Sequence, residues 1–471
     1  MRLKADTRAQ PGRDETLVKF FTRAERADIP ALRPITEAEW SAAANSTLLL
    51  HHAGLLCVGL GDEAKVTEQT LRVAAGTAVR TLQKAGRRIA ALDLRAYAKW
   101  TGAAAEGAVL AEYKFQDFKK TKAPGMESVR LIVNARDLAE ARKEARRGEI
   151  AGAATNLARE IGNQPGNLLY PETLAIQCRR MAKREKLKVA VLDEKALQRG
   201  GFGGMLAVGA GSKRPPRLIV LRHEGGRPGE APIALVGKAI TFDTGGISIK
   251  PADKMEEMIF DKCGGMAVLG AMAGIARLKL KRNVVGIIAS AENMPSAAAY
   301  RPGDIVKTYD GTYVEVINTD AEGRMVLADA IAYARKECRA RAVIDLATLT
   351  GACIVALGEY AAGLWSTSES LQAALLAASA KTGERLWPMP LYEDYTEQIR
   401  SEVAALKNTG GRYGGACTAA AFLKAFAGDT AWAHLDIAPV ANITKARPEL
   451  SRGATGFGTR LLMELVAGWR D

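Results

Sequence analysis

The chain has 471 residues, of which 48% are hydrophobic and 25% are charged, and its 66 lysines and arginines against 52 acidic residues give a formal charge of +14. This composition is typical of a globular protein and excludes a fibrous repeat or wholesale disorder, and the length indicates two or three domains. No run approaches the ~18 uninterrupted apolar residues of a membrane-spanning helix, and the first residues lack the apolar core of a secretory signal. We therefore expect a cytoplasmic protein with no membrane partner.

The first 135 residues alternate between predicted strands and helices, as in a small α/β domain. The expected elements are a buried strand with its exit loop over 48–61, a helix over 67–85, and strands over 87–95 and 128–135. A long helical pattern rich in Ala and Arg follows over 137–161 and stops at the turn sequence GNQPGN. Such a helix can link two domains.

We place the domain boundary inside this helical pattern. The expected division is an N-terminal α/β domain over 1–148 and a larger catalytic domain over 149–471, which begins with a linking helix over 149–162.

The second domain has longer and more apolar strand patterns. Strands are predicted over 231–240, 283–292 and 341–350, helices over 264–278 and 323–336, and a hairpin around Asp310. Continuous apolar runs separated by helices indicate an α/β fold with a mixed, largely parallel central sheet covered by helices. Ligands bind at the carboxyl ends of the strands in such sheets, so we expect the chemistry there.

Cysteine and histidine usage limits the kinds of metal site. The six cysteines stand singly, without a CxxC pair, which favours reduced thiols over disulfides or a thiolate zinc site. Only four histidines occur, and the sequence has no HExxH motif. A metal site in this chain must therefore be built mainly from carboxylates.

Two segments concentrate ionisable residues at predicted strand and helix ends. The first, which leaves the strand over 231–240, carries Lys238, Asp243, Lys250 and Asp261. The second, NTDAEGR, carries Asp320, Glu322 and Arg324 at alternate positions directly before a helix. In an extended chain such positions point to one side, so three ionisable groups converge.

Four carboxylates in this arrangement need counter-charges, because like charges a few ångströms apart cannot all stay ionised. Divalent cations provide them: hard oxygen ligands suit Mg²⁺ or Mn²⁺, and an added neutral lysine amine suits Zn²⁺. Four carboxylates exceed the needs of one ion, so we infer two metals at roughly 3.5–4 Å with bridging carboxylates. Two metals could serve amide hydrolysis or phosphoryl transfer.

Several ordered motifs resemble the leucyl aminopeptidase family, the cytosolic metallo-aminopeptidases with two metals. The matching segments are NTDAEGRM, VGK, TFDTGGISIK, FDKCGG, SAENMPSAAAYRPGDIV, LATLTGA, KNTGGRYGGACTAAAFL and WAHLDIA. They extend from about residue 148 to the end, and the first domain matches more weakly. The resemblance implies hydrolysis of the first peptide bond of peptides with a free N-terminus, and assembly as a homohexamer.

The resemblance also implies a role for each residue of the two segments. Lys238, Asp243, Asp261 and Glu322 hold the tighter metal, and Asp243, Asp320 and Glu322 hold the other, the two ions being Mn²⁺ or Zn²⁺. Lys238 then coordinates as a free amine with a pKa well below ~10.4. Lys250 stays charged and faces the scissile carbonyl, and Arg324 holds a bicarbonate-like base.

A pocket for the first residue of the substrate follows from the same resemblance. Its expected lining is Met258, Thr348, Gly351, Ala438 and Ala441. These residues are mostly small or apolar, which suits a neutral, leucine-like side chain.

Two alternative functions remain at this stage. The basic N-terminal domain, with clusters such as Arg142, Lys143 and Arg146, indicates an additional DNA-binding role, because a positive surface attracts polyanions. We favour a solvated helix face for these clusters, because acidic residues stand at helical spacing among them. A two-metal phosphatase would need more cationic groups than Lys250 and Arg324 to hold phosphate.

Overall fold

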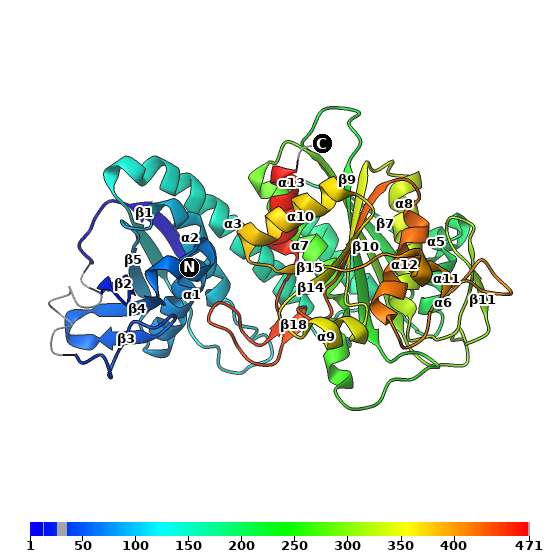
Figure 1. Ribbon diagram of the computed structural model, residues 1–471, viewed down its shortest axis with the longest axis horizontal. Coiled ribbons are helices and arrows are strands. Elements are labelled where there is room, and N and C mark those ends of the chain that lie inside the picture. Colours follow the sequence, from blue (N-terminus) through cyan, green and yellow to red (C-terminus); the bar gives the residue numbers. More distant parts are fainter. Residues whose placement is uncertain (13, 26–34, 470–471) are drawn as a thin grey trace. The chain divides into compact units, whose positions relative to one another are not determined.

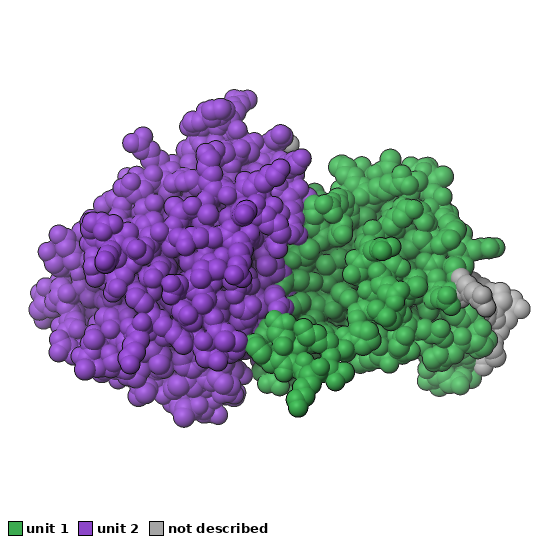
Figure 2. Space-filling view, turned by 180° about the vertical axis from the view of Figure 1, so that it is seen from behind, with its two compact units in different colours: residues 1–156, 444–452 green, residues 157–443, 453–471 purple. Residues whose placement is uncertain are grey.

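The computed structural model of the protein describes residues 1–12, 14–25 and 35–469 and divides the chain into two compact units, shown as ribbons in Figure 1 and as coloured surfaces in Figure 2. The first unit contains Met1–Asn156 and Thr444–Arg452, and the second contains Leu157–Ile443 and Gly453–Asp471. Helix α3 (Leu138–Gly162) runs without a break through the expected boundary at residue 148.

The first unit is built on a six-stranded sheet with the order β1-β6-β5-β2-β4-β3. Neighbouring strands are parallel except β3, which is antiparallel to β4. The strands are β1 Arg2–Asp6, β2 Thr16–Thr22, β3 Thr47–Leu50, β4 Leu55–Gly61, β5 Ile89–Asp93 and β6 Ser128–Ile132, and the helices are α1 Glu68–Lys84, α2 Thr101–Glu112 and the first part of α3. The small α/β fold expected from the sequence is confirmed.

Helix α1 begins where the sequence predicts it, because Thr67 caps it by accepting a hydrogen bond from the backbone N–H of Thr70. Its apolar face contributes Leu71 and Leu82, both fully buried, to the core of the unit. The C-terminal segment Thr444–Arg452 packs on the same helix: a Cβ added at Gly76 would lie 3.0 Å from the Cα of Glu449. No pattern in the sequence indicated this return of the chain to the first unit.

The apolar run over 48–61 forms two strands, so the expectation of one strand with an exit loop is wrong. β3 ends at Leu50, one 3₁₀ turn follows over His51–Ala53, and β4 returns antiparallel to β3. Gly54 makes the reversal with a φ of 57°, a left-handed conformation that costs little without a Cβ. The two adjacent histidines in the middle of the run were the signal for a turn.

The second unit contains an eight-stranded sheet with the order β15-β14-β17-β13-β9-β10-β8-β7. Four adjacent strands of this sheet run parallel to one another: β17, β13, β9 and β10. The pairs β14–β17, β10–β8 and β8–β7 are antiparallel. Helices α6, α8 and α12 pack on one face and α7, α10 and α13 on the other (Figure 1). This arrangement buries β9 and β10 almost completely and confirms the mixed, largely parallel sheet.

The elements of the second unit follow the expected alternation of strands and helices. The strands of the main sheet are β7 Lys188–Leu192, β8 Arg217–Glu224, β9 Ile233–Asp243, β10 Asn283–Asn293, β13 Ala342–Ala347, β14 Ala362–Ser366, β15 Leu386–Pro388 and β17 Ala431–Asp436. The helices are α4 Pro171–Glu185, α5 Glu194–Gly200, α6 Gly203–Gly209, α7 Cys263–Leu278, α8 Glu322–Lys336, α9 Gly351–Leu357, α10 Glu369–Thr382, α11 Glu393–Glu397, α12 Gly415–Ala427 and α13 Thr459–Gly468, together with the 3₁₀ helix η7 Met255–Lys262.

Two small sheets complete the unit. The predicted hairpin around Asp310 is formed by β11 (Ile305–Lys307) and β12 (Tyr313–Glu315), and β16 (Leu406–Lys407) extends it. Strands β18 (Asn442–Ile443) and β19 (Gly453–Ala454) pair with each other and flank the segment that returns to the first unit.

The order of the parallel strands places three polar residues, Asp243, Asn293 and Asp436, at the carboxyl ends of neighbouring strands. Asp243 ends β9 and pairs in register with Asn293, the last residue of β10. Asp436 ends β17 and pairs in register with Ala347, the last residue of β13. The carboxyl ends of these strands therefore form the floor of one site.

Within the described residues, one helical stretch, Met255–Leu278, is long and apolar enough to cross a membrane by composition, and 83% of its apolar window is buried inside the protein. Burial of this kind is what a core helix shows. All six cysteines are free and buried.

The close approach of β9 and α7 depends on glycine, and it gives a first prediction. A Cβ at Gly237 would lie 2.5 Å from the Cα of Gly265, so the helix would have to move. We expect Gly237→Ala to lower the free energy of unfolding by about 1–3 kcal/mol, the usual cost of overpacking a core. Urea denaturation measures the change. Gly468→Ala is the control, because a Cβ there meets nothing within 4 Å; equal losses in both variants would contradict the explanation.

Candidate functional site

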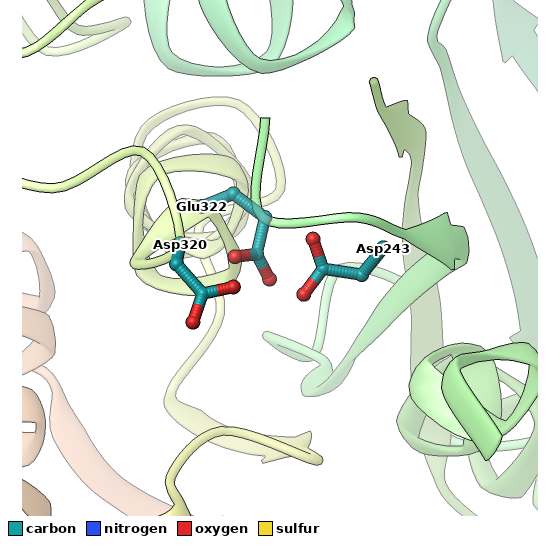
Figure 3. Close-up of side chains that lie close together, drawn as sticks. All are labelled: Asp243, Asp320 and Glu322. Atoms are coloured by element: carbon teal, nitrogen blue, oxygen red, sulfur yellow. The ribbon is translucent and has the colours of Figure 1, made fainter. Parts of the chain in front are cut away.

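Three carboxylates meet at the carboxyl end of β9. Asp243 comes from the strand itself, Asp320 from the loop before α8, and Glu322 from the first residue of α8. One oxygen of each lies within 4.8 Å of the others, and Figure 3 shows the three groups pointing toward one another. Asp243 and Glu322 are only 2% and 1% exposed. The structure thus brings together the acidic residues of both segments that the sequence singled out.

Lys238 connects this cluster to a fourth carboxylate. Its Nζ lies 2.8 Å from Oδ1 of Asp261 and 2.8 Å from Oε1 of Glu322, and it donates a hydrogen bond of 2.8 Å to the carbonyl oxygen of Thr348. Asp261 comes from η7, which packs against β9. Glu322 therefore belongs to two clusters of side chains: one with Asp243 and Asp320, and one with Lys238 and Asp261.

Lys250 reaches the same cluster from the far end of the tight loop that follows Asp243. Its Nζ lies 2.9 Å from Oδ2 of Asp243 and also pairs with Asp320. The loop folds back because Gly245 and Gly246 adopt φ values of 87° and 69°, which residues with a Cβ rarely reach. The side chain of Lys250 is partly exposed, so it lies at the rim of the site.

The charges of the site depend on one another. Burial and the neighbouring Asp243 raise the pKa of Glu322, and burial raises the pKa of Asp261. Burial lowers the pKa of Lys238, but Asp261, Glu322 and Asp243 raise it more, so its pKa lies above the ordinary lysine value. Without another cation, the ammonium groups of Lys238 and Lys250 are the counter-charges that offset part of the repulsion among these carboxylates.

Arg324 lies in the first turn of α8, two residues after Glu322. Its guanidinium is buried and donates a hydrogen bond of 2.8 Å from Nη1 to the carbonyl oxygen of Asn408, whereas Nε has no hydrogen-bond partner among the described residues. Burial lowers the pKa of Arg324 to about 10. A guanidinium with an unused donor fits a small planar oxyanion.

A second layer of polar residues orients the carboxylates. Nδ2 of Asn293 donates hydrogen bonds of 2.8 Å to Asp243 and 3.1 Å to the carbonyl oxygen of Thr319. The hydroxyl of Thr319 donates to the carbonyl oxygen of Gly245 at 2.6 Å, and the hydroxyl of Tyr300 donates to the carbonyl oxygen of Thr319 at 2.7 Å. Sequence reasoning missed this layer. The signal was Asn293, a polar residue that ends an apolar strand beside the strand of Asp243.

The five expected pocket residues come from three segments around the same strand ends. Thr348 and Gly351 follow β13, Ala438 and Ala441 follow β17, and Met258 lies in η7. The hydroxyl of Thr348 donates a hydrogen bond of 2.7 Å to Oδ1 of Asp261, which joins the pocket segment to the carboxylates. A Cβ added at Gly351 would meet no atom within 4 Å, so the space beside it is open.

The donor set fits divalent cations. Oδ2 of Asp261 and Oε2 of Glu322 are buried and have no hydrogen-bond partner among the described residues. A buried carboxylate oxygen without a partner is unfavourable, and hard oxygens of this kind are the ligands that divalent metals prefer. The residues therefore provide both the ligand type and the unused coordination capacity for metal ions.

Family models match most of the chain. Residues 156–463 match the catalytic domain of the cytosol aminopeptidase family, and residues 31–122 match the N-terminal domain of the same family.

Individual relatives agree with this match. A probable cytosol aminopeptidase of Cenarchaeum symbiosum (strain A) is 46% identical over 88% of this chain and 86% of the relative, and one of Solibacter usitatus (strain Ellin6076) is 42% identical over 97% of both chains. The solved structure of the bottromycin maturation enzyme BotP in complex with Mn is similar with a TM-score of 0.88 and 34% identity, over 96% of this chain and 99% of that chain.

The chain belongs to the cytosol aminopeptidase family. Membership implies a metallo-aminopeptidase, a hydrolase that acts on peptides. The metal-binding expectation and the resemblance stated from the sequence are thereby confirmed at the level of the family.

The buried lysine of the site gives a second prediction. In the presence of a chelator, we expect Lys238→Met to lower the free energy of unfolding by about 3–5 kcal/mol, because Asp261 and Glu322 lose a buried counter-charge. Lys188→Met is the matched control: Lys188 pairs with Glu224 at 2.7 Å but is exposed, so its loss should cost at most about 1 kcal/mol. Chemical denaturation of both variants measures the difference, and similar losses would contradict the charge argument.

Proposed function

We propose that this protein removes neutral, preferably leucine-like residues from the N-terminus of peptides and that it uses two divalent metal ions. The observation that carries the proposal is the position of Glu322 in two ligand groups at once. Its Oε1 lies 2.8 Å from Lys238, which also contacts Asp261, and its carboxylate lies within 4.8 Å of Asp243 and Asp320. A carboxylate shared between two groups of ligands is typical of a two-metal centre.

The tighter ion would be held by Lys238, Asp243, Asp261 and Glu322, and the other by Asp243, Asp320 and Glu322. When bound, the two metals would supply a water activated at neutral pH and polarisation of the peptide carbonyl, and a bicarbonate at Arg324 would supply a general base. Lys238 has to release the proton at Nζ in order to coordinate as a neutral amine, so metal binding and deprotonation of this residue are coupled.

Lys250 neutralises the negative charge that develops on the peptide oxygen during attack. Asp243 and Asp320 hold its ammonium group in place, and its partial exposure leaves it accessible to a substrate at the rim. Arg324 is anchored through Nη1 and leaves Nε unused, and this arrangement would allow its guanidinium to hold an oxyanion. Both residues act in the transition state as fixed positive charges in a largely buried site.

The pocket residues favour a neutral side chain at the first position of the substrate. Thr348, Gly351, Ala438, Ala441 and Met258 offer no charge to a substrate and leave open space beside Gly351. The neighbouring carboxylates favour a free amine over an acylated nitrogen, which accounts for action at the first peptide bond only.

Other properties of the family support narrower proposals. The Mn in the BotP structure supports manganese as the first ion to test, with zinc as the alternative. We also propose a homohexamer and a cytoplasmic location, on the resemblance to cytosol aminopeptidases.

The ion pairs described for the basic cluster on α3 do not favour a DNA-binding role. Lys143 pairs with Glu140 at 3.0 Å and Arg146 pairs with Glu149 at 2.9 Å, as on a solvated helix face. A gel shift that is lost when Arg142 and Arg146 are neutralised would restore this alternative. If the protein were a phosphatase, it would hydrolyse p-nitrophenyl phosphate, and we do not expect this activity.

The assay for the proposed function is release of p-nitroaniline from leucine p-nitroanilide by the chain loaded with Mn²⁺ or Zn²⁺. We expect activity in the wild type, loss on chelation, and a fall of more than about 100-fold in Glu322→Gln, because loss of one stabilising group already costs that much. Glu224→Gln, at an exposed pair, should retain activity. An inactive metal-loaded wild type or a fully active Glu322→Gln would refute the proposal.

The role of Lys250 gives a separate prediction. We expect Lys250→Met to lower kcat by about 10²–10³-fold, the usual effect of removing one oxyanion donor. Binding of Mn²⁺, measured by calorimetry, should be retained because Lys250 is not a proposed ligand. An unchanged kcat would exclude the role.

A further inference from the structure

Asp436 is a fully buried carboxylate that the proposed mechanism does not use. It ends β17, and its side chain accepts three hydrogen bonds. Oδ1 accepts from the backbone N–H groups of Leu349 and Ala438, both at 3.1 Å, and Oδ2 accepts from the hydroxyl of Thr350 at 2.6 Å.

These three donors belong to two different loops. Leu349 and Thr350 lie in the loop after β13, and Ala438 lies in the loop after β17. The two loops leave neighbouring parallel strands, where Asp436 is in register with Ala347. One carboxylate thus connects the two chain segments that carry four of the five proposed pocket residues.

The loop after β13 is fixed at both of its ends. At one end, Thr348 donates to Asp261 at 2.7 Å and its carbonyl oxygen accepts from Lys238 at 2.8 Å. At the other end, Thr350 caps α9 by accepting a hydrogen bond of 3.1 Å from the N–H of Cys353. Because Asp436 holds Thr350 between these ends, it sets the position of the loop relative to the carboxylates and relative to Ala438.

We propose that Asp436 is a positioning residue for substrate specificity: it fixes the distance between the loops after β13 and β17 and thereby the width of the pocket for the first residue of the peptide. This inference rests on the proposed aminopeptidase function. Hydrogen bonds in a low-dielectric interior are stronger than in water, so a buried carboxylate that accepts three of them from two loops makes a rigid connection. Rigid walls matter because one methylene in an apolar pocket discriminates only about 10–200-fold.

A second buried carboxylate provides a matched control. Asp329, in α8, is also fully buried and accepts backbone hydrogen bonds of 2.8 Å from Met205 and 2.8 Å from Tyr309. Its donors come from α6 and from the loop between β11 and β12, and neither carries a proposed pocket residue. Loss of Asp329 therefore tests what removal of a buried carboxylate does to the fold alone.

The experiment compares kcat/KM for leucine p-nitroanilide with kcat/KM for alanine p-nitroanilide in the full chain loaded with Mn²⁺. The ratio is the informative quantity, because a smaller fraction of folded enzyme lowers both rates equally. Asp436→Asn keeps the size of the side chain but puts an NH₂ group where Oδ2 accepts from Thr350. Thr350→Val replaces the hydroxyl with a methyl group and so removes the hydrogen bond to Asp436 together with the cap of α9, and Asp329→Asn is the control.

We expect the leucine-to-alanine ratio to fall about fivefold or more in Asp436→Asn and Thr350→Val, which is within the range that pocket contacts control, and to change less than about twofold in Asp329→Asn. An unchanged ratio in active Asp436→Asn, or an equal fall in Asp329→Asn, would overturn the inference while the proposed function stands. If Asp436→Asn does not fold, Thr350→Val decides, and an unchanged ratio there overturns the inference. A folded, Mn²⁺-binding wild type that cleaves neither substrate would overturn the proposed function itself.

Discussion

The constraint on which the site depends is the repulsion among buried carboxylates at the end of β9. Glu322 and Asp243 are almost inaccessible to water, and Asp261 is buried on the other side of Lys238. Charges in such surroundings are stable only when opposite charges lie beside them. The lysines at positions 238 and 250 satisfy this requirement within the chain. The same requirement favours the binding of divalent cations, because a bound cation can take over the counter-charge that a protonated lysine provides.

The sheet explains why these groups come together at all. Parallel strands place their carboxyl ends at one edge, and helices on both faces leave that edge as the place where polar side chains can converge. Strands β9, β10, β13 and β17 each end in or directly before a residue of the site or its supporting layer. The loops that follow them differ in length and sequence, so the same scaffold carries a residue of the carboxylate cluster on one strand and proposed pocket residues after the next.

Much of this arrangement could be predicted from the sequence. The apolar runs of β9 and β10 and the alternation of strands and helices define the sheet, and the rule of strand ends then locates Asp243, whereas Glu322 was indicated by the alternating ionisable residues before α8. The local patterns failed where two distant segments meet. Asn293 and Asp243 are in contact although they are 50 residues apart in the sequence, and Asp436 and Thr350 are 86 residues apart. A local hydrophobic pattern carries no information about such distant pairs. The reversal at Gly54 was missed because hydrophobic composition on both of its sides is the same.

The path of the chain through the first unit has a consequence for its biosynthesis. Helix α1 packs against the segment around Glu449, which is translated more than three hundred residues later and is flanked by the paired strands β18 and β19 of the second unit. An N-terminal fragment released by a protease, or a nascent chain still on the ribosome, lacks this segment and leaves the corresponding face of α1 uncovered. The small first unit is therefore completed only after Thr444–Arg452 has been synthesised.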